Sequence, residues 1–182
     1  MRLALDVDDT CANFMGPATA VLGPSLLTGA HSLRDMYPDQ PDQVQTLLSD
    51  GSFYAGLPAM DGAARAIGEL TGLGFRVFYI SARPSALDWI TRDWLFWNGF
   101  PQGAVHCVGR AGGRKAGLIK LLDIDIAVDD YPAALDEIRL LSSAKAVVMD
   151  RDWNQDYHDI PRLMHWDDAL DLFQGLINEA MN

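Results

Sequence analysis

Two aspartates stand two residues apart where the first apolar run of the chain ends. Residues 3–5 favour a β-strand, and Asp6 and Asp8 follow it. This pair suits metal-assisted phosphoryl transfer, because one carboxylate can attack phosphorus while the other protonates the departing oxygen. A divalent cation must then hold the dianionic phosphate beside them. The same residues also fit a strand followed by an aspartate-rich turn, since aspartate favours turns.

A second apolar run, residues 76–80, is followed by Ser81, Ala82 and Arg83. A serine hydroxyl at that position can hydrogen-bond a phosphate oxygen without adding charge. Arg83 is one of the basic residues that could offset the negative charge around a bound phosphate ester. We therefore expect this segment to bind the phosphate.

A third apolar run, residues 124–128, ends in the adjacent carboxylates of Asp129 and Asp130. Adjacent carboxylates are unfavourable unless a cation compensates them, so we expect Asp129 to ligate a metal and Asp130 to support it. Lys115 opens a helical stretch after two glycines, and its ammonium could neutralise both the phosphate and Asp6. Lys120, in the middle of the same stretch, is the alternative lysine.

These residues, taken in order, resemble the four motifs of the haloacid dehalogenase (HAD) superfamily of phosphatases. The motifs are Asp6-x-Asp8-x-Thr10, Ser81, Lys115 and Asp129-Asp130. Within that superfamily the chain is most similar to the 5'(3')-deoxyribonucleotidases, and the likeness spans nearly the whole chain. It continues in these segments: Ala12-Asn13-Phe14, Phe53-Tyr54, Ile80-Ser81-Ala82, Trp94-Leu95, Val128-Asp129-Asp130, Trp153-Asn154-Gln155 and Trp166-Asp167-Asp168.

The resemblance implies a Mg²⁺-dependent phosphomonoesterase that acts through an aspartyl-phosphate. Asp6 would be the nucleophile, Asp8 the general acid and base, and Lys115 the third catalytic residue. The metal ligands would be Asp6, Asp8 through its backbone carbonyl, and Asp129. The substrate, a small phosphate monoester and by resemblance a nucleoside monophosphate, would be bound by Thr10, Phe14, Tyr54, Ser81, Ala82 and Arg83.

Several alternatives stay open. Phe14 and Tyr54 would pack on a nucleobase by resemblance, or they are packing residues at the two hinges of a cap. The family usually has glycine where this chain has Asp9, and its lysine spacing fits Lys120 better than Lys115. The substrate could also be a sugar phosphate or another small phosphoester. A noncatalytic Mg²⁺- and phosphate-binding protein is the alternative of another class, but it would lack Asp6 or Asp8.

Composition and charge exclude several classes of partner. The chain has 182 residues, of which 49% are hydrophobic, and a net charge of −11. That length suits one core with a small insertion. The negative charge disfavours binding to nucleic acid polymers or to an anionic membrane. No stretch approaches the ~18 apolar residues of a membrane span, and the chain shows no signal segment, so we expect a cytoplasmic protein. A homodimer is left open.

Alternating strand and helix signals predict the α/β class. Continuous apolar runs predict parallel strands at residues 3–7, 76–80, 104–108, 124–128 and 144–149. Helices are expected at 62–71 with Asp61 as the cap, at 84–98 opened by Pro84, and at 114–122, 132–142 and 167–180. The prediction is a doubly wound, parallel five-stranded sheet, the Rossmann-like core of the HAD superfamily. Residues 1–14 and 61–182 form this core, and residues 15–60 form an inserted helical cap, most clearly helical at 43–48. Trp153 and its neighbours would line the same pocket or anchor a surface loop.

Overall fold

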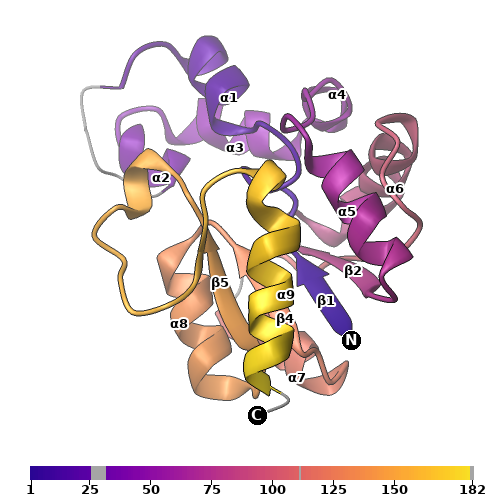
Figure 1. The fold of residues 1–182 in the computed structure, drawn as a ribbon. Coiled ribbons are helices and arrows are strands. Elements are labelled where there is room, and N and C mark those ends of the chain that lie inside the picture. The colour runs from indigo at the N-terminus through magenta and orange to yellow at the C-terminus, as the bar shows by residue number, and fades with distance from the viewer. Residues whose placement is uncertain (26–31, 111, 181–182) are drawn as a thin grey trace.

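Six parallel strands form one sheet in the part of the chain that the structure describes, residues 1–25, 32–110 and 112–180 of a computed structural model (Figure 1). Their order is β3-β2-β1-β4-β5-β6, so the order reverses between β1 and β4. Residues 26–31 of the predicted cap lie outside the described residues. The strands are β1 (Arg2–Leu5), β2 (Arg76–Ser81), β3 (Ala104–Cys107), β4 (Ile126–Asp129), β5 (Lys145–Met149) and β6 (Arg162–Leu163).

The predicted number of strands, five, is wrong, because the sheet has a sixth strand at its edge. β6 is only two residues long, and it pairs with β5 through Val148 and Met149. A strand this short carries no run of apolar residues, so the periodicity of the sequence does not reveal it. The class of the fold, α/β with a parallel Rossmann-like sheet, is confirmed.

Helices cover both faces of the sheet, as the continuous apolar runs predict. Leu3 and Leu5 point to one face, where they pack with residues of α5 (Ala63–Gly72), α6 (Asp88–Trp97) and α9 (Ala169–Ala180). Ala4 points to the other face, against α7 (Arg114–Leu121) and α8 (Pro132–Leu141). This alternation follows from the two-residue period of a strand. The doubly wound arrangement is therefore present.

The helix boundaries differ from the predicted ones at three N-termini. The helix predicted from residue 167 begins as a 3₁₀ turn over Trp166–Asp168 and becomes α-helical, as α9, at Ala169. α5 begins after Gly62, whose φ is +74°, and no side chain caps it, so the predicted cap at Asp61 is wrong. The helix predicted from Pro84 begins as a 3₁₀ turn over Ser85–Leu87 and becomes α-helical only at Asp88. The first turn of a helix often takes this tighter form.

The cap lies over the carboxyl ends of the strands, between β1 and α5 in sequence (Figure 1). It contains α1 (Met15–Leu22), α2 (Leu33–Met36), α3 (Pro41–Ser49) and α4 (Gly51–Ala55). The two connections to the core are hydrogen-bonded to each other. The N–H of Asn13 donates to Pro58 O at 2.8 Å, and the N–H of Met60 donates to Cys11 O at 2.8 Å. The cap boundaries at residues 15 and 60 stay a prediction.

Asp9 joins the loop after β1 to the first cap helix. Its φ is +54°, in the left-handed region that glycine adopts more readily than aspartate. One carboxylate oxygen accepts the N–H groups of Phe14 and Met15, both at 3.0 Å, at the start of α1. The glycine usual at this position suits the backbone, and the aspartate adds a cap for two otherwise unpaired donors.

No helix in the described part of the chain is long and apolar enough to cross a membrane.

The short strand β6 depends on the side chain of Arg162. Its guanidinium donates to Asp150 at 2.6 Å, to the Asn154 side chain at 2.8 Å, and to the carbonyls of Asn154 and Tyr157 at 2.9 and 2.8 Å. Lysine keeps the charge but cannot form this planar set of bonds. We expect Arg162→Lys to lower the free energy of unfolding by about 2 kcal/mol in urea titrations. The exposed Arg92→Lys is the matched control, and equal stability of the two variants would contradict this role.

Candidate active site

The site begins where the strand order reverses. Asp6 follows β1 and Asp129 ends β4, and these strands are neighbours in the sheet. The N–H of Asp6 donates to Val128 O at 2.9 Å, which continues the pairing one residue beyond β1. Because parallel strands present their carboxyl ends at one edge, the two carboxylates meet there, the usual ligand position of an open α/β sheet.

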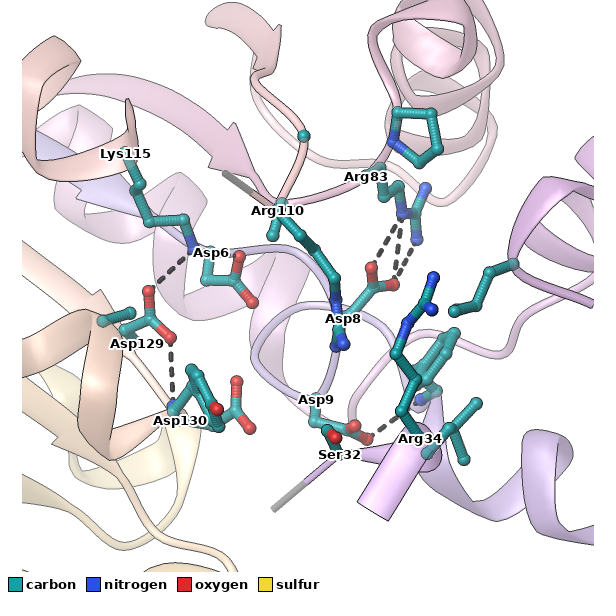
Figure 2. A pocket seen from close by; sticks show the side chains of 18 of the residues that line it. Asp6, Asp8, Asp9, Ser32, Arg34, Arg83, Arg110, Lys115, Asp129 and Asp130 are labelled. Carbon is teal, nitrogen blue, oxygen red and sulfur yellow. Dashed lines mark hydrogen bonds and ion pairs between the residues drawn. The ribbon is translucent and has the colours of Figure 1, made fainter. Parts of the chain in front are cut away.

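A cavity of about 400 Å³ opens at this edge, between the core and the cap (Figure 2). The core contributes carboxylates and basic side chains, and the cap contributes apolar and polar side chains. Its lining includes Asp6, Asp8, Asp9, Phe14, Ala82, Arg83, Arg110, Lys115, Asp129 and Asp130 from the core, and Met15, Ser32, Leu33, Arg34, Gln45, Leu48 and Tyr54 from the cap.

Lys115 joins the two strand ends. Its ammonium donates to Asp6 at 2.5 Å and to Asp129 at 2.7 Å (Figure 2). It is the second residue of α7, whose start is fixed by Gly113 at φ +74° and by the bond from the Gly113 N–H to Glu137 at 2.9 Å. Lys120 is exposed on the last turn of the same helix. Of the two candidate lysines, the structure therefore places Lys115 at the site.

Three buried carboxylates cluster here, and two of them, Asp6 and Asp129, contact this ammonium. Oxygens of Asp6, Asp129 and Asp130 lie within 4.8 Å of one another. Burial raises the pKa of Asp6 to about 7, although Lys115 lowers it, and burial together with Asp129 raises that of Asp130 well above its usual value. Burial alone would lower the pKa of Lys115, but Asp129 and Asp6 raise it. One ammonium does not balance three carboxylates, so the set of oxygen donors fits a divalent cation.

The loop after β5 holds Asp130 in this cluster. The indole N–H of Trp153 donates to the Asp130 carboxylate at 3.1 Å. The amide of Asn154 donates to the carbonyls of Asp130 and Met149, both at 2.8 Å, and it is buried. The sequence predicts that this segment lines the pocket or anchors a surface loop, and neither role describes it fully. Trp153 is not part of the cavity lining, but it holds Asp130, which is.

Asp8 points away from the acidic cluster. Its carboxylate accepts hydrogen bonds from Arg83. The Nε donates to Oδ1 at 3.1 Å and to Oδ2 at 3.0 Å, and the Nη2 donates to Oδ1 at 2.6 Å (Figure 2). It lies within the lining of the cavity but outside the group of oxygens around Lys115. The two carboxylates of the first motif therefore stand in different electrostatic surroundings, one beside an ammonium and other acids, and one beside a guanidinium.

The predicted substrate-binding residues divide into two groups. Ala82, Arg83, Phe14 and Tyr54 line the cavity, whereas Thr10 and Ser81 are not part of its lining among the described residues. The Ser81 hydroxyl accepts the N–H of Arg83 at 3.1 Å. The Thr10 hydroxyl is buried and has no hydrogen-bond partner in the described part of the chain.

The aromatic residues at the hinges pack on one another. The Phe14 ring is 5.7 Å from that of Phe53 and 6.0 Å from that of Tyr54, and both Phe14 and Tyr54 are buried. The Arg83 guanidinium lies over the Tyr54 ring, 4.5 Å from its centre. With their faces covered in this way, these rings support the hinge-packing alternative more than a nucleobase platform.

Sequence reasoning missed the polar residues that the cap adds to the cavity. Arg34, from α2, donates to Gln45 of α3 at 2.8 Å, and both line the cavity with Ser32. Arg110 lines it from the core. Arg34, Gln45 and Ser32 have no motif spacing, so the sequence carries no signal that singles them out, whereas Arg110 is among the basic residues expected near the phosphate.

Comparisons with known proteins agree with this geometry. The family model described as "5' nucleotidase, deoxy (Pyrimidine), cytosolic type C protein" matches residues 1–180. A protein of Oceanobacillus iheyensis named "Putative nucleotidase" is 31% identical over 141 residues, which cover 77% of this chain and 74% of that protein.

Two solved structures show the same fold. A HAD-superfamily hydrolase of subfamily IA from Geobacter sulfurreducens has a TM-score of 0.62 at 13% identity, covering 94% of this chain and 95% of its own. The D,D-heptose 1.7-bisphosphate phosphatase from B. bronchiseptica, complexed with magnesium and phosphate, has a TM-score of 0.53 at 15% identity, covering 98% and 99%.

The strand order and the residues at the ends of β1 and β4, together with these matches, define a phosphatase with the fold of HAD-superfamily hydrolases. The match over residues 1–180 is more specific than the fold. The chain belongs to the family of the cytosolic type C 5' nucleotidases and is an enzyme of the 5'-nucleotidase type.

The buried carboxylates predict an unusual dependence of stability on pH. The pKa of Asp6 is about 7 and that of Asp9, raised by burial, about 6, both above the ordinary 3.8. The folded protein therefore takes up protons at a higher pH than the unfolded chain does. The stability that this proton binding contributes is fully present below pH ~3.8 and is lost as the pH rises through the folded-state pKa values. We expect the free energy of unfolding of the metal-free protein to fall by roughly 2 kcal/mol per pH unit between pH ~5 and ~7, because each titrating group contributes up to about 1.4 kcal/mol per pH unit.

Thermal unfolding at several pH values, without added metal, measures this effect. Asp6→Asn removes one of the titrating groups, so its stability should change less steeply with pH than that of the wild type. Parallel pH profiles for the two proteins would contradict the assignment.

Proposed function

We propose that this enzyme hydrolyses nucleoside monophosphates, deoxyribonucleotides among them, with Mg²⁺ and through an aspartyl-phosphate on Asp6. The observation that carries the proposal is the contact of Lys115 with both Asp6 and Asp129, beside a third buried carboxylate, at the point where the strand order reverses. A phosphate placed there would meet a nucleophile and a cationic partner together.

The chain supplies the groups for two steps. Asp6 would attack phosphorus as the bond to the ester oxygen breaks, and Asp8 would give its proton to that departing oxygen. In the second step Asp8 would take a proton from water as the water attacks the aspartyl-phosphate, which releases phosphate and restores Asp6. Lys115 would offset the negative charge of the transferring group throughout.

The metal would be held by the buried carboxylates. Asp6, Asp129 and the backbone carbonyl of Asp8 are the predicted ligands, and the position of Asp130 in the same cluster adds it to this set. A bound Mg²⁺ supplies positive charge at the transferring phosphoryl group. The fit rests on the oxygen donors and on their excess negative charge, which Lys115 alone does not balance.

The family and the relative's name support a nucleotide as substrate. A sugar phosphate is the second candidate, because the aromatic rings of Phe14 and Tyr54 are already covered and the cap adds the polar side chains of Arg34 and Gln45 instead. A noncatalytic role finds no support, since Asp6 and Asp8 are both present at the cavity. A cytoplasmic location and a homodimeric assembly stay predictions.

Phosphate release tests the proposal directly. With Mg²⁺, we expect deoxynucleoside and ribonucleoside monophosphates to be hydrolysed faster than sugar phosphates, and Asp6→Asn to lower kcat for the best substrate by about 1000-fold or more. Asp93→Asn makes the same change on the exposed face of α6 and serves as the control. Turnover by Asp6→Asn at the wild-type rate would overturn covalent catalysis, and faster hydrolysis of sugar phosphates would favour the second candidate.

Trp153 should tune the metal site through Asp130. Trp153→Phe keeps an aromatic ring but removes the donor that holds the carboxylate. We expect the apparent affinity for Mg²⁺ to fall about tenfold, because groups that orient metal ligands have effects of this size. The Mg²⁺ concentration needed to raise the Tm measures it without turnover. The exposed Trp89→Phe is the control, and an unchanged midpoint for Trp153→Phe would contradict a role for Asp130 at the metal.

A further inference from the structure

Every nitrogen of the Arg83 guanidinium donates a hydrogen bond to a side chain of the protein. Two of its nitrogens bond the carboxylate of Asp8, at 2.6 to 3.1 Å, and Nη1 donates to the hydroxyl of Thr91 at 3.0 Å. The side chain of Arg83 has no exposed surface, whereas that of Asp8 is 23% exposed. A buried fork of this kind fixes the direction of the carboxylate that it holds.

The same guanidinium touches the hinge of the cap. Its flat face lies over the ring of Tyr54, in α4, with 4.5 Å between the guanidinium carbon and the ring centre. Tyr54 is stacked on Phe14, which immediately precedes α1, so the two connections of the cap meet in one aromatic cluster. Arg83 therefore contacts both Asp8 and the segment through which the cap joins the core.

From these contacts we propose that Arg83 is a positioning residue, which orients Asp8 for proton transfer and links that orientation to the hinge at Tyr54. The inference rests on the proposed function, in which Asp8 protonates the departing oxygen. Arg83 would act through Asp8 and would not itself touch the substrate. Every nitrogen of its guanidinium faces a protein partner, so binding phosphate would require the ion pair with Asp8 to break.

Two phosphate ester substrates can show whether Arg83 orients the acid Asp8 or binds the phosphate. A deoxynucleoside 5'-monophosphate leaves as an alcohol and needs a proton on its oxygen when the bond to phosphorus breaks. Para-nitrophenyl phosphate leaves as the nitrophenolate anion, which needs no proton. The value of kcat/KM reports the steps up to that bond cleavage. Loss of a correctly placed acid should therefore lower kcat/KM for the nucleotide more than for para-nitrophenyl phosphate.

We expect Arg83→Met to lower kcat/KM for the nucleotide about 100-fold and for para-nitrophenyl phosphate less than about fivefold. Arg83→Lys keeps the charge without the fork and should recover part of the loss. Asp8→Asn should show the same selectivity between the esters, and adding Arg83→Met to it should change the ratio no further, since the two residues act through one group. Circular dichroism and Tm confirm that each variant folds.

The hinge variants test the link to the cap while both members of the ion pair remain. Tyr54→Leu removes the ring under the guanidinium, and we expect kcat/KM for the nucleotide to fall about tenfold with little change for the aryl ester. Tyr54→Phe keeps the ring face and should recover most of this loss. Equal effects of Tyr54→Leu on the two esters would overturn the link between the hinge and Asp8.

Other outcomes would overturn the role of Arg83 itself. If Arg83→Met lowered kcat/KM for both esters equally and weakened inhibition by inorganic phosphate, Arg83 would be a phosphate ligand. If it changed neither ester, Arg83 would have no role in the reaction. Wild-type protein that cleaved neither ester would refute the proposed function, and this result is recognisable before any variant is made.

Discussion

The contact of one ammonium with two carboxylates from separate strands is the interaction on which the site depends. Lys115 reaches Asp6 and Asp129 only because β1 and β4 are parallel neighbours and because α7 begins at the same edge of the sheet. Each part of that arrangement has a local cause: apolar runs bury both strands, and the left-handed Gly113 starts the helix. Removing the ammonium would leave three buried carboxylates together, which burial makes strongly unfavourable.

Asp6 and Asp8 lie in different electrostatic surroundings, which suits them to different chemical roles. Burial among like charges raises the pKa of Asp6, whereas Asp8 lies outside that cluster in the fork of Arg83. Two acidic groups placed in different environments can take different roles in one reaction, as nucleophile and as proton donor. The loop after β5 adds a third environment, in which Trp153 and Asn154 hold Asp130. The cap covers the cavity that these groups line and adds Arg34 and Gln45 to its lining.

Much of the core could be predicted from the sequence, because its signals are local. Apolar runs followed by aspartates located the strand ends, and the glycines before Lys115 favoured it over Lys120. Other features depend on contacts between distant segments. The partner of Arg83, 75 residues earlier in the chain, is decided by packing, so a phosphate-binding arginine and an acid-positioning arginine look alike in sequence. Strand β6 is too short to show a period, and it depends on the bonds of Arg162.

A crystal structure with Mg²⁺ and beryllium fluoride, which imitates a phosphoryl group on a carboxylate, would show whether Asp6, Lys115 and Asp129 form one reaction centre. We expect the fluoride group on Asp6, one cation between Asp6 and Asp129, and the ammonium of Lys115 turned toward the fluorides. A structure in which the cation and the fluoride group bind elsewhere, with Lys115 still joining Asp6 to Asp129, would contradict this arrangement.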